Sequence, residues 1–322
     1  MIDAVRQSAG RHHHFTVTIM TNFQIRPHRP ARPLLYLAPA IALLAVFFLA
    51  PIVVNAVIAF TDMGASLRVG EFTVKNFERI VQRDARIPVV LLTTLIYVTA
   101  TLFIFNIGLG ALLAMASTAI PDRLGNFFRG LWLLPRMSPA VLYGILWIWI
   151  ADPSPGGLLN QVTATLGLPP VNLRNDFPLF LVILANGVVG ASFAMVILTS
   201  SIRSIPSHLA NAARVDGASE WGVLRHVVAP ALSQPIRFIT IYQALSLMTT
   251  YEYILLITGG GPVYDSTPYA LYIYRRAFEN GAYAYGAALA LGLMVIGVVF
   301  TLVQWRITNM RSTFAAPKIE VL

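Results

Sequence analysis

The chain has 322 residues, of which 57% are hydrophobic and only 11% charged, whereas a soluble domain carries roughly 25% charged residues. It contains no cysteine, which excludes a disulfide framework and a thiolate metal site. The formal net charge is +9, but this basic balance implies no nucleic-acid partner, because it is the usual signature of membrane insertion. The composition therefore predicts an all-α polytopic membrane protein.

Apolar segments near the length needed to cross a bilayer, about 20 residues, recur along the chain. The six predicted transmembrane helices lie near residues 34–60, 88–116, 131–151, 178–202, 236–258 and 285–307. They form one transmembrane domain over 34–309, between an N-terminal tail (1–33) and a C-terminal tail (310–322). Residues 1–19 contain three consecutive histidines and precede Met20. We expect a disordered segment or an extension before the true start there, in preference to a metal site.

The distribution of Lys and Arg predicts the orientation of the helices. With the N-terminus inside, the inner segments carry 14 of the 23 basic residues and the outer loops carry 8, which satisfies the positive-inside rule. Both termini and the loop 204–235 are therefore predicted to face the cytoplasm.

The loop 204–235 is a polar island between two apolar segments, and its residue pattern predicts two short helices. The first is predicted over 207–215 and is ended by Gly217, because glycine takes the left-handed conformation at little cost. Ser219 is the expected N-cap of the second helix, which Pro230 is expected to stop. A folded element between two membrane spans is expected to bind a cytoplasmic partner. The alternative is an ordinary helical hairpin on the membrane surface.

This island resembles the "EAA" coupling loop of bacterial ABC-importer permeases, which a cytoplasmic ATPase grips. The spacing of the motif is intact from Asn211 to Pro230. The resemblance assigns ATPase coupling to Asn211, Ala212, Ala213, Asp216, Gly217, Ala218 and Trp221. Asn211 replaces the family's glutamate and Ala229 replaces a leucine. A carboxylate at this position could pair with an arginine of the ATPase, whereas the amide of Asn211 can only form hydrogen bonds. We therefore expect the ATPase to dock here through shape.

The strings 253–262, 266–268 and 272–274, after Tyr251 and Glu252, are similar to the carbohydrate (maltose-type) subfamily of these permeases. The resemblance implies a sugar or sugar-like cargo imported by alternating access across the bacterial inner membrane. It also implies a second permease subunit, a dimer of ATPase subunits that carries ATP and Mg²⁺, and an external substrate-binding protein. The transmembrane helices are expected to contact membrane lipid.

No enzymatic chemistry is predicted within the chain itself. A phosphate-binding loop needs Gly-Lys-Ser/Thr, and neither Lys75 nor Lys318, the two lysines, lies in that context. No catalytic residue, metal ligand or cofactor is therefore expected here.

Polar side chains in the fifth predicted span are the candidates for a substrate path. Tyr242, Ser246, Thr249 and Tyr253 recur at steps of four, three and four, within about a 60° arc of one helix face. Rings and hydroxyls suit a sugar, but helix packing explains the same stripe equally well. Glu252 lies near the outer end of the helix, where a functional and a structural role are equally expected.

In the third predicted span, Pro135 and Pro139 are expected to kink the helix. Arg136 lies one to two turns inside that span, and we expect its head group to reach back to the cytoplasmic surface.

Two other functions compete with the importer subunit. An ion-coupled secondary transporter needs buried carboxylates or histidines, and Glu252 is the one candidate. A non-transporting membrane scaffold needs only the cytoplasmic partner site. Co-purification of an ATPase, and its stimulation by a binding protein with sugar, distinguishes the importer from both.

Overall fold

The computed structural model describes residues 32–68 and 70–308, with side chains from residue 36 on. Expectations for residues 1–31 and for the tail 310–322 lie outside this range. Within it the chain is helix and loop, apart from one isolated bridge between Thr61 and Phe72. The chain divides into two units, 1–51 and 52–322, which are described separately.

The first unit holds α1 (Arg32–Leu44), the π-helical turn η1 (Ala45–Leu49) and the start of α2 (Ala50–Ala59). These elements run on as one apolar helix over Tyr36–Ala59, long enough to cross a membrane. The first predicted span is thereby confirmed. None of the side chains in η1 is buried.

The second unit begins its long helices with α4 (Ile87–Ala100), η3 (Thr101–Leu109) and α5 (Gly110–Ala119). They form one candidate span of 33 residues, which confirms the second predicted span. Pro88 lies in its first turn, where the missing amide hydrogen of proline costs no helical bond.

The third predicted span is broken into two helices. Helix α6 (Asp122–Met137) and helix α7 (Ala140–Ile150) are bent by 97° at Ser138 and Pro139. Ser138 is extended, with ψ of 138°, because the ring of a following proline disfavours the helical conformation. The predicted kink is therefore confirmed, but the prediction of a single continuous helix over 131–151 is wrong.

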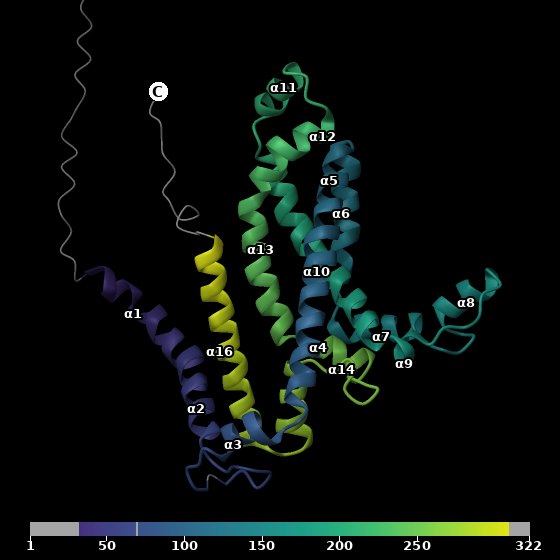
Figure 1. Cartoon of the computed structure of the whole chain (residues 1–322). Helices are drawn as coiled ribbons and strands as arrows, with labels where there is room; N and C mark the ends of the chain where they lie inside the picture. The colour runs from purple at the N-terminus through teal and green to yellow at the C-terminus, as the bar shows by residue number, and fades with distance from the viewer. Residues whose placement is uncertain (1–31, 69, 309–322) are drawn as a thin grey trace, which may run out of the picture. The chain divides into compact units, whose positions relative to one another are not determined.

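Helix α10 (Pro178–Arg203) is the centre of the second unit and confirms the fourth predicted span. In its most apolar window 72% of the residues are buried. It contacts η3, α5, α6 and α13 (Ala229–Thr249), and Figure 1 shows α5, α6 and α13 running beside it. A helix surrounded in this way is a packing core rather than a lipid-facing surface.

The fifth predicted span, 236–258, differs from the structure at both ends. Helix α13 starts before it and stops at Thr249, and after an extended Thr250 a separate helix α14 (Glu252–Ile257) follows. The sixth predicted span is confirmed by α16 (Tyr283–Thr308). Among the described helices, four are long and apolar enough to cross a membrane, or five with the bent pair. The total of six spans stays a prediction.

Further short helices occupy the segments that connect the long helices of the second unit. They are α3 (Lys75–Glu78), η2 (Arg79–Arg83), α8 (Leu158–Thr165), α9 (Leu173–Asp176), α15 (Tyr269–Tyr274) and η5 (Arg275–Glu279). Figure 1 shows α3 at the far end of α16 from its C-terminus.

Buried polar bonds join the long helices. The Asn186 amide on α10 donates to the Tyr97 hydroxyl on α4, and Gln243 Nε2 on α13 donates to the Gly190 carbonyl at 2.9 Å. A Cβ added at Gly190 would overlap the side chain of Asn106. The helices thus approach closely at glycine, and two of their polar side chains bond across the helix contacts. The amide of Asn106 and the hydroxyl of Thr101 are buried there without a hydrogen-bond partner in the described part of the chain.

A buried carboxylate connects the short helices to α16. Asp84 Oδ2 accepts hydrogen bonds from Tyr272 and, at 2.7 Å, from Tyr285 Oη, while its Oδ1 accepts from the Arg86 amide at 3.1 Å. Its side chain is 6% exposed, and the Arg276 guanidinium lies 3.8 Å away. Burial by itself raises the pKa of Asp84, but these hydrogen bonds and the charge of Arg276 together hold that pKa below its usual value.

We predict that Asp84→Asn lowers stability by about 1–3 kcal/mol, because a hydrogen-bonded charge is replaced by a neutral acceptor. Because the pKa of Asp84 is lower in the folded state, the ionised carboxylate contributes to the free energy of unfolding above about pH 4, where the unfolded carboxyl is also ionised. This contribution is lost as the pH falls through the pKa of the folded state. Thermal unfolding in detergent at pH 7 and at successively lower pH measures the difference. Asp62→Asn, at an exposed carboxyl, is the control. Equal melting of wild type and Asp84→Asn at pH 7 contradicts the prediction.

Candidate functional site

The first helix of the loop 204–235 is α11 (Ser207–Val215), as predicted. Pro206 precedes it in an extended conformation. Gly217 has a φ of +87°, and the Ala218 amide donates back to the Ala213 carbonyl at 2.9 Å. This is the left-handed glycine stop that the sequence predicts, and it turns the chain sharply toward the second helix.

The second helix begins at α12 (Glu220–Val223) with the predicted cap. Ser219 Oγ accepts a hydrogen bond from the Gly222 amide at 3.2 Å. Glu220 lies in the first turn, where a carboxylate is favourable to the helix dipole. The loop is therefore two capped helices with a defined turn between them.

Pro230 does not stop this second helix, contrary to the sequence prediction. A π-helical segment, η4 (Leu224–Val228), continues α12 into α13, and the Ala229 amide donates to the Leu224 carbonyl. Bonding five residues back widens the helix locally, which lets the proline ring pass the preceding turn without breaking the chain direction. The loop is thus mechanically continuous with the fifth long helix.

Arg214 connects the two short helices, a role that the sequence reasoning missed. Its Nε donates to Glu220 Oε1 at 2.8 Å and its Nη2 to Glu220 Oε2 at 3.1 Å. Its Nη1 donates to Asn211 Oδ1 at 3.4 Å. The hydrogen bond and then the charge of Arg214 lower the pKa of Glu220. The opposite charges at 214 and 220, across a glycine turn, were the signal available in the sequence.

The structure places every predicted coupling residue on one solvent-facing loop. Asn211, Ala212, Asp216, Gly217 and Trp221 are exposed, and Ala213 and Ala218 are half-buried. Trp221 is 69% exposed, close to the exposed Leu209 and Val215 in sequence, whereas Val223 is buried and anchors the loop. Large apolar side chains on a polar loop are typical of a protein-binding surface.

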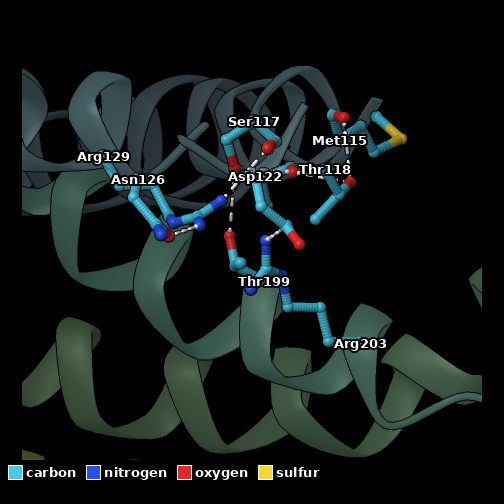
Figure 2. A network of polar contacts seen from close by, with 9 residues as sticks. Met115, Ser117, Thr118, Asp122, Asn126, Arg129, Thr199 and Arg203 are labelled. Atoms are coloured by element: carbon cyan, nitrogen blue, oxygen red, sulfur yellow. Dashed lines mark hydrogen bonds and ion pairs between the residues drawn. The ribbon is translucent and has the colours of Figure 1, made fainter. Parts of the chain in front are cut away.

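A polar network fixes the platform from which this loop starts (Figure 2). Arg203 Nη2, at the end of α10, pairs with Asp122 Oδ1 at the start of α6 at 2.6 Å. Arg129 Nη1 donates to the Ser117 carbonyl at 3.0 Å, and the Ser117 and Thr199 hydroxyls lie 3.4 Å apart. The ends of α5, α6 and α10 are therefore joined directly below the loop.

A hollow of about 420 Å³ separates the loop from this platform. It is lined by Met115, Thr118, Ile202, Ala210, Leu224 and Val228, among others. The two short helices are thus braced by Arg214 rather than by tight packing underneath them.

The predicted substrate-path residues fall on two helices rather than one. Tyr242, Ser246 and Thr249 lie exposed on α13, but Tyr253 lies on α14 beyond the break at Thr250. The single stripe is therefore correct for three residues and wrong for Tyr253, since extended backbone at Thr250 resets the helical phase. Thr249 Oγ1 donates to the backbone at Leu245 and Ser246, as the packing alternative expects.

The guanidinium of Arg136 lies against α10 instead of reaching back toward the end of the helices that carries the loop 204–235, contrary to expectation. Its guanidinium carbon lies 4.8 Å from the centroid of the Phe193 ring. Phe193 is ten residues before Arg203, the end of α10, which corresponds to about 15 Å along a helix. The charge is therefore held beside the middle of α10.

Among the described residues, no three His, Cys, Asp or Glu side chains gather in a way that suits a metal ion. Glu252 is exposed, and no ion pair is recorded for it within the described part of the chain. The absence of a catalytic or metal site in the whole chain stays a prediction.

The long helices around α10 and the clamped loop between α10 and α13 are the architecture of a transport permease. The chain has a TM-score of 0.76 with a chain of a bacterial ABC transporter involved in the import of the acidic polysaccharide alginate. That likeness covers 86% of this chain and 96% of the other, at 21% identity.

Residues 106–309 match the family of binding-protein-dependent transport system inner membrane components, and the chain belongs to this family. It is 30% identical over 284 residues to the sn-glycerol-3-phosphate transport system permease protein of Yersinia pseudotuberculosis, covering 85% of this chain and 93% of that protein. It is 27% identical over 287 residues to the multiple sugar-binding transport system permease protein of Streptococcus mutans, covering 85% and 94%. It is thus a multi-pass inner-membrane permease subunit.

We predict that Gly217→Ala destabilises the loop by about 1–2 kcal/mol, because alanine is strained in the left-handed conformation. No atom lies within 4 Å of the added Cβ, so the cost is confined to the backbone. Hydrogen exchange of residues 207–228 measures it as faster opening. Gly130→Ala, also without a neighbour within 4 Å but inside α6, is the control and is expected to stabilise its helix. Unchanged exchange in Gly217→Ala overturns the role of this glycine.

Proposed function

We propose that this chain is the membrane permease of an ATP-driven importer, and that the loop 204–235 transmits the movement of a separate ATPase. The observation that carries the proposal is a clamped pair of helices with Trp221 exposed and with a continuous helical connection to α13. A rigid element is needed because a lever that bends internally would not move the helix behind it. The Arg214–Glu220 pair supplies that rigidity.

The partners follow from this arrangement and from the family. The loop, and both termini, face the cytoplasm, in agreement with the excess of Arg and Lys on that side. An ATPase dimer, with its ATP and Mg²⁺, binds the loop. A second permease subunit completes the path, and an external binding protein delivers the ligand to the opposite end of the unit. The chain itself hydrolyses nothing.

The cargo that we propose is a carbohydrate or a similar polyol. Exposed hydroxyls and rings at Tyr242, Ser246 and Thr249 on α13, with Tyr253 nearby in sequence, offer stacking faces and hydrogen-bond partners. The two relatives serve sn-glycerol-3-phosphate and multiple sugars by name, which supports this class of cargo. Alternating access results when ATP-driven motion of the loop tilts α13 against α10.

We predict that Trp221→Ala weakens binding of the ATPase by about 2 kcal/mol or more, because an exposed tryptophan that becomes buried in an interface commonly dominates its affinity. This corresponds to roughly a 30-fold loss. The measurement is the amount of ATPase retained by the tagged chain at decreasing protein concentration, together with ATP-dependent uptake in vesicles.

Trp149→Ala is the matched control, because Trp149 is also exposed but lies on α7. It is expected to retain the ATPase. Equal retention by Trp221→Ala and wild type refutes the docking site. Uptake driven by a proton gradient without any ATPase favours a secondary transporter, and stable ATPase binding without uptake favours a scaffold.

A further inference from the structure

An arginine lies at membrane depth, beside the break in the third span. Arg136 is in the last turn of α6, fourteen residues after Asp122, which is about 21 Å along the helix. Its position beside Phe193 on α10 gives a similar depth from the other helix. Because α6 ends at Met137, the favourable interaction of a cation with a helix C-terminus helps to hold the charge in place.

The guanidinium has no partner for its hydrogen-bond donors within the described part of this chain. Arg136 is exposed, and neither a hydrogen bond nor an ion pair is recorded for it among the described residues. Its guanidinium carbon lies over the face of the Phe193 ring, 4.8 Å from the centroid. Stacking on a ring occupies the face of the guanidinium and leaves its five in-plane donors free. An unpaired cation at this depth is costly and is a functional candidate.

The aromatic support of Arg136 continues across two helices. Phe193 stacks on Tyr242 of α13 with centroids 4.9 Å apart, and Tyr242 stacks on Phe238 at 6.1 Å. Phe238 and Tyr242 are both about half exposed. The three rings form a ladder that starts at the cation and ends on an open helix face. Because the rings stack on each other, Tyr242 presents its exposed edge and its hydroxyl, which suit contact with the C–H groups and hydroxyls of a sugar.

Hydroxyl groups lie on the same helix as the end of this ladder. Ser246 is exposed one turn after Tyr242 on α13, and the Tyr242 side chain is itself about half exposed. The ladder thus joins a charge with free donors to a ring edge and hydroxyls on α13. A neutral sugar uses the rings and hydroxyls, but only a carboxylate or phosphate also satisfies Arg136, and a fork of two parallel hydrogen bonds is the preferred geometry.

We propose that Arg136, Phe193 and Tyr242 form a subsite in the translocation path that selects carbohydrates carrying a carboxylate or a phosphate. The inference rests on the proposed function and sharpens it, because it gives the cargo a negative charge. Phe193 holds the guanidinium in place, Tyr242 offers its exposed ring edge and hydroxyl to the sugar, and Arg136 binds the oxyanion.

The test uses the complete complex, with the partner permease and the ATPase, in nanodiscs of phosphatidylcholine. The probes are D-glucuronate and D-glucose, which share a pyranose ring and differ in the group at carbon 6, with D-glucose 6-phosphate as the phosphate probe. Direct binding is measured by ligand-observed NMR competition. Wild type is expected to bind glucuronate and glucose 6-phosphate at least about tenfold more tightly than glucose, the usual gain from hydrogen bonds to a charged partner.

Three variants show which residue makes the preference. Arg136→Gln is expected to bind the three probes equally, and Arg136→Lys to retain part of the preference, because lysine keeps the charge without the fork. Arg123→Gln removes the same charge from the first turns of α6 and is expected to behave as wild type. Phe193→Leu is expected to weaken the preference while glucose binding persists.

The inference is overturned if wild type shows no preference for the anions, or if Arg136→Gln keeps it. It is also overturned if phosphatidylglycerol in the nanodisc abolishes the preference, since the oxyanion bound by Arg136 is then a lipid headgroup. ATPase activity stimulated by a binding protein, measured in the same preparation, tests the proposed function separately. A stimulated ATPase without anion preference refutes the subsite alone, and an absent ATPase refutes the importer.

Discussion

The close approach of helices to α10 is the constraint on which the rest of the structure depends. Hydrophobic burial does little to associate helices in lipid, so contact relies on small residues and on polar bonds between helices. Gly190 serves both needs, because its missing side chain leaves room for Asn106 and its carbonyl accepts the hydrogen bond from Gln243. The positions of α5, α6 and α13, and hence of the loop and of the aromatic ladder, follow from this packing.

Interruptions in the long helices lie where function is proposed. The bend at Ser138 and Pro139 ends α6 just after Arg136, and the break at Thr250 separates α13 from Tyr253. Irregular backbone is tolerated at membrane depth where it is buried in protein or lines a cavity. Broken helices in transporters commonly form substrate sites. Two such breaks lie in this chain, one just after the cation of Arg136 and one just before Tyr253.

The loop 204–235 joins two requirements that usually conflict. As the proposed docking site of an ATPase, it must present an apolar surface, as Trp221 does, and it must keep its shape when that ATPase moves. The second need is met by the Gly217 turn, the Ser219 cap and the Arg214–Glu220 pair. Because Asn211 also accepts a hydrogen bond from Arg214, Asn211 contributes to the internal bracing of the loop.

The sequence by itself determined the class of protein, the position of most long helices and the glycine turn of the loop 204–235, because apolar length, charge asymmetry and turn chemistry are local properties of the chain. The coupling role of the residues in that loop stays a prediction. Tertiary structure decided the continuity of the helix past Pro230, the phase change before Tyr253, and the partners of Arg214 and Arg136. These depend on side chains that meet across helices or across a turn, and on small changes of helical pitch. A linear pattern placed Arg136 at the surface, whereas the ring of Phe193, 57 positions later in the chain, holds it at the middle of α10.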